Sequence, residues 1–235
     1  MRPKVSVAWP ALKEAAIGVY EHLGLAMLFS PLWLLLGLFP LVFVSLPLLE
    51  MEKLFPLRFL FPLLVGAFLF MPATCSIFEV CRLILAKEDV NFLTFFRAFG
   101  ASYKRALQVG LWNGFLFLVL AADLFFAFHS GKRFFQFMGG IWVWFGAFLL
   151  VMNVYLPVLV AEGNTVKNAF KKAALLVLDN LGSSLLLLAE TALLLLLSIA
   201  VPPLLLLFFP AMIGFLYLRA YQIIMTKYED DPDAA

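Results

Sequence analysis

Residues 23–49, LGLAMLFSPLWLLLGLFPLVFVSLPLL, are 27 residues between His22 and Glu50 without one charged side chain. About 20 apolar residues are enough for a helix to cross the hydrocarbon core of a bilayer. Comparable stretches recur at 59–78, 106–122, 134–161 and 181–218. The sequence therefore predicts an all-α integral membrane protein.

The composition agrees with this class of protein. Hydrophobic residues make up 64% of the chain and charged residues 14%, whereas soluble domains use roughly 25% charged residues. The net charge of +2 is too small to indicate a nucleic-acid partner. Cys75 and Cys81 fall in one predicted span about 240° apart around the helix, so we expect neither a mutual disulfide nor a shared metal.

The sequence contains few residues and no motif suited to catalysis. His22 and His129 are its two histidines and lie on opposite predicted sides of the membrane. The chain contains no H-E-x-x-H, C-x-x-C or Walker-type glycine loop. We therefore expect no catalytic residues, no metal site and no cofactor.

The number of spans depends on residues 181–224, whose two charged residues are Glu190 and Arg219. This length fits two helices with a turn at Pro202 and Pro203. The predicted arrangement is one polytopic domain, residues 1–227, followed by an acidic tail, residues 228–235. Its six spans are 23–48, 59–81, 106–127, 135–160, 183–201 and 204–224.

Lysine and arginine accumulate in cytoplasmic loops, so their distribution tests this arrangement. Six spans place 13 of these residues on one side: Arg2, Lys4, Lys13, Arg82, Lys87, Arg97, Lys104, Arg105, Lys167, Lys171, Lys172, Arg219 and Lys227. The other four, Lys53, Arg58, Lys132 and Arg133, lie on the opposite side. A five-span chain gives the weaker ratio of 11 to 6, so we expect six spans with both termini cytoplasmic.

Each pair of spans is preceded by a segment with amphipathic helical spacing. The clearest segment follows Asn91, a candidate helix cap, and its aromatic residues recur every three or four positions. This interfacial stripe consists of Phe92, Phe95, Phe96, Phe99 and Tyr103, with Ser102 on another face. Thr165 is a candidate cap for the segment before the fifth span. We expect these helices to lie at the cytoplasmic interface, each joined to the next span by a bend.

Two of these segments resemble each other in sequence. PALKEAAIGVYEHLG, which begins at Pro10, aligns with NAFKKAALLVLDNLG, which begins at Asn168, and residues 21–24 match residues 179–182. A middle copy, FFRAFGASYKRALQ, keeps the apolar-basic pair Phe96 and Arg97. The pattern predicts three copies of one helix-and-hairpin unit, offset by 84 and 74 residues, with approximate threefold symmetry. The alternative is coincidence among Leu-rich segments.

Residues 72–112, PATCSIFEVCRLILAKEDVNFLTFFRAFGASYKRALQVGLW, resemble the YesL family of bacterial membrane proteins. The family pattern P-A-T-x-x-x-x-x-V-x-R is present at residues 72–82, and an F-F-x-x-F segment follows at residues 95–99. Met71 stands where family members usually have Gly. The family has no established activity, and its members often accompany genes for carbohydrate uptake and degradation. The resemblance therefore implies a multi-pass protein of the bacterial inner membrane.

Several polar residues lie within the predicted spans. Gly110 and Gly114 form a G-x-x-x-G pattern that predicts close helix packing, and Glu79 is expected to pair with Arg82. Five further side chains fall in one layer about 10 Å below the cytoplasmic boundary: Glu190, Asn113, Asn153, Ser30 and Ser76. This layer is either a closed hydrogen-bonded seam with Glu190 protonated, or a polar pocket open to the cytoplasmic leaflet.

Two functions follow from these alternatives. The first is a non-enzymatic accessory protein that binds a partner, expected to be a carbohydrate transporter or a second copy of this chain, within the lipid bilayer. The second is a small transporter or solute-binding subunit that uses the layer around Glu190.

Overall fold

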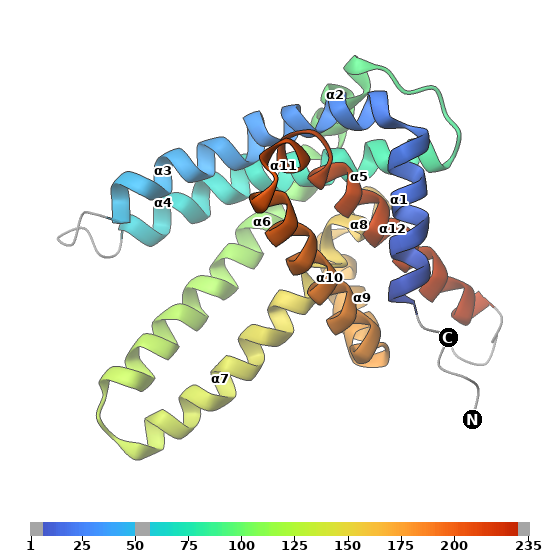
Figure 1. Ribbon diagram of the computed structural model, residues 1–235. Helices are drawn as coiled ribbons and strands as arrows, with labels where there is room; N and C mark the ends of the chain where they lie inside the picture. Colours follow the sequence, from blue (N-terminus) through green and yellow to red (C-terminus); the bar gives the residue numbers. More distant parts are fainter. Residues whose placement is uncertain (1–6, 50–56, 230–235) are drawn as a thin grey trace.

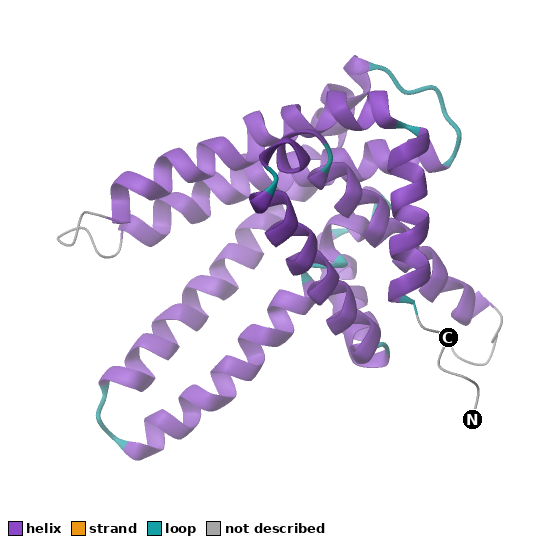
Figure 2. Ribbon diagram, viewed as in Figure 1, coloured by secondary structure: helices purple, strands orange, loops and turns teal. Residues whose placement is uncertain are grey.

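The computed structural model describes residues 7–49 and 57–229, and within these ranges every regular element is a helix (Figure 2). Helix α1 (Ala8–Glu21) precedes a first hairpin. One arm of this hairpin is α2 (Leu23–Trp33), η1 (Leu34–Leu38) and α3 (Phe39–Leu49). The other arm is α4 (Leu57–Val65), η3 (Gly66–Phe70) and α5 (Met71–Leu85).

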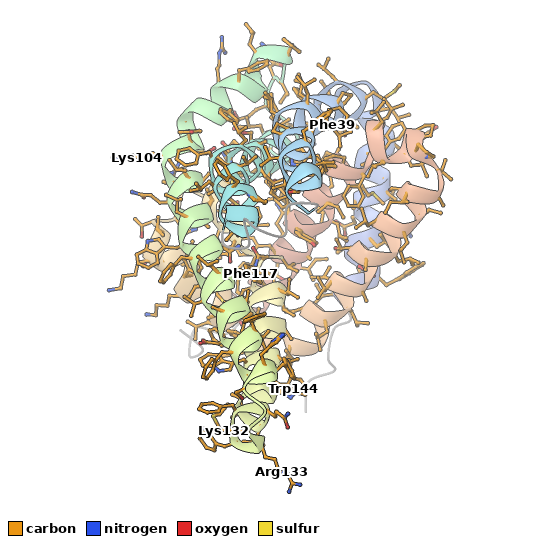
Figure 3. All side chains as sticks on the ribbon, turned by 90° about the vertical axis from the view of Figure 1, so that its left-hand side faces the viewer. Phe39, Lys104, Phe117, Lys132, Arg133 and Trp144 are labelled. Atoms are coloured by element: carbon orange, nitrogen blue, oxygen red, sulfur yellow. The ribbon has the colours of Figure 1, made fainter. Side chains whose placement is uncertain are left out.

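Two further hairpins follow. The second pairs α6 (Phe92–His129) with α7 (Arg133–Met152), after which the short α8 (Leu156–Ala161) leads to α9 (Val166–Asp179). The third pairs α10 (Leu181–Ala200) with α12 (Phe209–Glu229) through α11 (Pro202–Leu207). The start of α1 and the end of α12 lie on one side of the molecule, away from the α6–α7 turn (Figure 1). Figure 3 shows Lys132 and Arg133 at the outer end of that second hairpin.

Within residues 7–49 and 57–229, five helices are long and apolar enough to cross a membrane, which confirms an all-helical, multi-pass architecture. They are Leu23–Ser45, Phe61–Leu85, Phe92–His129, Arg133–Met152 and Leu181–Ala200. The expected sixth span, residues 204–224, is divided between α11 and α12, because the chain leaves helical geometry at Phe208.

The first hairpin contains two π-helical turns, and each one ends two residues before a proline. The Phe39 N–H bonds to the carbonyl of Leu34, and the Met71 N–H to that of Gly66, five residues back in both cases. The next residues, Pro40 and Pro72, have no N–H and cannot continue the ordinary helical pattern. A turn widened by one residue absorbs the missing hydrogen bond without ending the helix.

The fourth predicted span, residues 135–160, is wrong in its last third. Helix α7 ends at Met152, residues 153–155 form a turn, and α8 starts in a new direction. Pro157 explains the break, since it has no N–H to donate to the carbonyl of Asn153 four residues earlier. Helix α8 then packs against α5, α6 and α9. Four side chains of α8 and the residue before it are at most 1% exposed: Tyr155, Leu156, Val158, Leu159 and Val160.

The bend expected in the middle amphipathic segment is also wrong, because α6 continues for 38 residues from Phe92 to His129. No proline interrupts that range, and Gly100 is accommodated as part of the helix. Asn91 caps α6 as predicted: its side chain accepts from the Thr94 N–H while the Thr94 hydroxyl accepts from the Asn91 N–H. At Thr165, by contrast, the side chain makes no capping hydrogen bond.

The other two amphipathic helices do end in bends, at His22 and Asn180. The backbone angles of these residues are nearly the same, φ −119° and ψ 35° for His22 and φ −128° and ψ 39° for Asn180. Each residue donates its N–H four residues back, to Gly18 and Leu176, and accepts from the N–H four residues ahead. The two positions aligned by sequence therefore share one local conformation.

Helix α1 packs lengthwise against α12 and does not lie free on the surface. Its small residues Ala8, Ala11, Ala15 and Gly18 form the buried face. Gly18 lies beside Phe215, and Glu14 lies 3.4 Å from the Nε atom of Arg219, so the two helices run antiparallel. The Glu14 carboxylate thus gives a counter-charge to an arginine within an apolar helix.

Among the glycines of the described residues, Gly110 of α6 comes closest to the backbone of another helix, as the G-x-x-x-G pattern predicted. A Cβ atom at Gly110 would lie 2.9 Å from the Cα atom of Ala67 and 3.1 Å from the Cβ atom of Met71. At Gly114 the nearest side-chain atom, from Leu63, would be 3.5 Å away, an ordinary contact. Gly110 therefore fixes α6 against the π-helical turn η3.

Replacing Gly110 with Ala should lower thermal stability, because the new methyl group meets backbone that cannot move aside. Overpacking of this kind costs about 1–3 kcal/mol. Gly100 is the matched control in the same helix, since a Cβ atom there meets nothing within 4 Å. Gly100→Ala should be neutral or slightly stabilising. Thermal unfolding in detergent measures both variants, and an unchanged midpoint for Gly110→Ala would contradict the close contact.

Candidate functional site

The polar side chains of α10 form a stripe along one face of the helix. Asn180, Ser184, Thr191 and Ser198 are separated by four, seven and seven residues, which brings them to the same side. The Ser184 hydroxyl lies 2.7 Å from the hydroxyl of Tyr155, beside α8, and the Thr191 hydroxyl lies 2.7 Å from that of Tyr217 on α12. Hydroxyl pairs therefore join α10 to the start of α8 and to α12.

A second polar group closes the end of this stripe where α9 meets α10. The Tyr228 hydroxyl donates to the Asp179 carboxylate at 2.8 Å and accepts from the Asn180 amide at 3.2 Å. Burial, and then the hydrogen bond to Asp179, raise the pKa of Tyr228 above its ordinary value. Its hydroxyl thus stays protonated and remains a donor at neutral pH.

The predicted five-residue layer separates into parts. The Asn113 amide donates to the Asn153 amide oxygen at 2.7 Å, so these two side chains join α6 to the end of α7. Ser76 donates to the carbonyl of Pro72 in its own helix. Ser30 Oγ and Glu190 Oε2 are buried and have no hydrogen-bond partner among the described residues. The structure therefore brings together two of the five residues by hydrogen bonding, and ligand binding by the layer stays a prediction.

The predicted aromatic stripe of α6 faces in more than one direction. Phe95 is fully buried and stacks against Phe29, with ring centroids 6.2 Å apart. Phe99 and Tyr103 are half-buried, whereas Phe92 and Phe96 are exposed. The buried face continues through Ala98, Ser102, Ala106 and Val109. The expectation that Ser102 lies on another face than the stripe was wrong, because Ser102 is buried on the same face as Phe95, and its hydroxyl donates to the carbonyl of Ala98.

The segment around Pro72 is a packing junction. Thr74 accepts a hydrogen bond from the Trp33 indole at 3.0 Å and donates to the carbonyl of Phe70. Ala73 is fully buried, and a Cβ atom at Gly37 would lie 3.3 Å from its side chain. About two turns further along α5, Arg82 forms the predicted pair with Glu79 through two hydrogen bonds, of 2.9 and 2.7 Å.

The residues that sequence reasoning missed are the tyrosines Tyr155, Tyr217 and Tyr228. A signal was present, since the chain has 27 Phe but six Tyr. A buried Tyr hydroxyl normally has a hydrogen-bond partner, and Ser184 and Thr191 lie at helical spacing to supply one. Among the described residues, no three His, Cys, Asp or Glu side chains form a group that could hold a metal ion. The polar groups are arranged for helix association.

These features define a polytopic helical membrane protein held together by interhelical hydroxyl and amide pairs. Comparison with known families gives one match: residues 54–124 are similar to the family described as "Protein of unknown function, DUF624". This region contains Pro72, the Glu79–Arg82 pair and Gly110. No curated protein and no solved structure matches the chain.

The pair of Tyr155 and Ser184 gives a direct test of the hydroxyl contacts. Tyr155→Phe, Ser184→Ala and the double variant should show a coupling of about 0.6 kcal/mol, and at most ~1.7 kcal/mol, typical of interhelical hydrogen bonds in membranes. Unfolding by a denaturing detergent measures the three free energies. Tyr20→Phe is the control, because the Tyr20 side chain is 76% exposed. Additive effects of the two substitutions would show that the contact contributes nothing.

Proposed function

We propose that this chain is a non-enzymatic accessory protein of the bacterial inner membrane, related to the YesL family, that binds a partner of a carbohydrate-uptake system. The resemblance at residues 72–112 falls inside the region that matches the family of unknown function. The link with carbohydrate uptake comes from that resemblance. An accessory role agrees with a molecule whose tyrosine, serine and asparagine side chains largely bind one another between helices.

The observation that carries the proposal is the exposure of Phe92 and Phe96 beside the fully buried Phe95. Their side chains are 46% and 42% exposed. Their rings contact each other edge to face, with centroids 5.4 Å apart, and Phe96 also contacts Phe95. Aromatic side chains that are held in place but uncovered are typical anchors of protein interfaces. The partner is expected to be a transporter subunit or a second copy of this chain.

The proposed topology has six spans with both termini in the cytoplasm. Two hydrogen-bonded pairs, Thr191 with Tyr217 and Asn180 with Tyr228, support α12 as the sixth span, because they place it antiparallel to α10 along most of its length. Arg219 in α12 has the Glu14 carboxylate as a counter-charge, which lowers the cost of an arginine at this depth.

The proposed internal repeat consists of three units, each an amphipathic segment followed by a hairpin. The matching backbone angles at His22 and Asn180 support the relation between the first and third units. In the second unit, the amphipathic segment and the span are one helix, α6. In the proposed repeat, the junction between the amphipathic segment and the following span is therefore bent in the first and third units and continuous in the second.

Cysteine labelling tests the topology. In a background with Cys75 and Cys81 replaced by Ala, a cysteine at Ser130 should react from the periplasmic side and one at Asp231 from the cytoplasmic side. Ser130 is preferred to Gly131 because Gly131 has a φ of +66°, which strains any other residue. Labelling of both positions from the same side would contradict six spans.

Substitution of the exposed rings tests the accessory role. Phe92→Ser with Phe96→Ser should abolish co-purification with the transporter subunits while the protein still folds, since neither ring fills the core. Phe134→Ser with Phe137→Ser is the matched control, because these rings are also exposed, at 66% and 69%, but lie at the start of α7. Equal retention of the partner by both double variants would contradict a docking role for α6.

The alternative transporter role predicts a different result for purified protein in liposomes. An accessory protein alone should move no solute, and Glu190→Gln should leave its folding nearly unchanged, because the amide is close in shape to a protonated acid. A transported proton would need the carboxyl group of Glu190. Solute uptake by the purified protein that disappears in Glu190→Gln would therefore overturn the accessory role.

A further inference from the structure

A groove of about 360 Å³ lies between α6 and α9. Trp112 and Leu116 form its α6 wall, and Val166 and Phe170 form its α9 wall. The remaining lining residue, Lys167, is exposed near the start of α9. The groove is therefore apolar along its length and has a cationic side chain near one end.

More positive charge is found around that same end. The guanidinium of Arg105 lies beside Gly163, its Nη1 atom 3.3 Å from where a Cβ atom of Gly163 would be. Arg105 is two helical turns before Trp112 on the same face of α6. Lys171 follows Lys167 by one turn on α9, and Lys104 lies at the outer edge of α6 in Figure 3.

These cations remain available to bind an anion. No carboxylate among the described residues forms an ion pair with Arg105 or Lys167. Glu162, next to Gly163, is exposed and forms no ion pair with these cations among the described residues. Within the proposed topology, all four cations lie on the cytoplasmic side, where anionic lipid headgroups attract basic segments.

The shape and charge of the groove require an amphiphilic occupant. An apolar chain would cover Trp112, Leu116 and Phe170 but leave the cations unpaired, and a soluble anion would leave the aromatic walls bare. We propose that the groove binds one anionic phospholipid, with an acyl chain between the walls of α6 and α9 and the phosphate at Lys167 and Arg105. This assignment does not depend on the accessory role, because a transporter would present the same surface to lipid.

Quenching of Trp112 fluorescence by brominated lipid tests the proposal. The full chain is placed in phosphatidylcholine bilayers with a minor fraction of brominated phosphatidylglycerol, or with the same fraction of brominated phosphatidylcholine. Subtracting the signal of Trp112→Phe isolates this one tryptophan. The anionic lipid should quench Trp112 more strongly than the zwitterionic one, and added salt should reduce the difference.

Charge variants show whether the named residues are responsible. Arg105→Gln with Lys167→Gln should remove the preference, each change lowering it about fivefold, which corresponds to ~1 kcal/mol per basic residue near an anionic surface. Lys132→Gln with Arg133→Gln removes the same charge at the opposite end of the second hairpin and should leave the preference intact. If the Arg105 variant fails to fold, Lys167→Gln with Lys171→Gln replaces it, because both lysines are exposed.

The proposal would be overturned by equal quenching by the two lipids, by an unchanged preference in the groove variants, or by a loss of preference in the Lys132 and Arg133 control. Soluble glycerol phosphate should not compete with the lipid. Competition would identify a site for free anions and exclude a phospholipid as the occupant.

Discussion

The constraint on which this structure depends is that a helix in hydrocarbon has to satisfy its own backbone, because no water is present to replace a lost hydrogen bond. Pro40 and Pro72 each remove one donor, and the chain responds with a π-helical turn just before each proline. At Pro157 the helix breaks instead. There the Asn153 side chain donates to the carbonyl of Leu149, and the Tyr155 hydroxyl finds Ser184, so nearby side chains support the break.

The break at Pro157 also determines where the core lies. Because α8 starts in a new direction, the segment around Tyr155 runs between α5, α6 and α9 and becomes the most completely buried part of the chain. Hydropathy alone cannot reveal this, since a buried segment and a lipid-facing segment are equally apolar. The sequence thus predicted the helices and most of their ends, as well as Asn91 as a cap, the Glu79–Arg82 pair and the close contact at Gly110. The sequence placed α8 in a straight fourth span, because the length of the apolar stretch was the criterion for a span.

The candidate site was less predictable, for a related reason. Ser102 was expected on another face than the aromatic stripe; in this protein it lies on the buried face with Phe95, and its hydroxyl binds the carbonyl of Ala98. Large aromatic side chains were assigned to one stripe, yet Phe92 and Phe96 remain exposed while Phe95 is fully buried. The polar residues that do meet across helices were found by sequence where both partners are amides, Asn113 and Asn153. They were missed where one partner is a tyrosine.

The distribution of polar groups separates the inside of this molecule from its surroundings. Between the helices, hydroxyls and amides bind one another, and the pair of Glu14 and Arg219 adds a charged contact between α1 and α12. The cations near the start of α9 and in the first part of α6, by contrast, have no carboxylate partner among the described residues and lie beside apolar walls that include Trp112 and Phe170. Exposed aromatic side chains next to unpaired cations are costly in water but suited to the interface of a bilayer with anionic headgroups. The neutral polar pairs thus lie between the helices, whereas these cations lie beside exposed aromatic side chains.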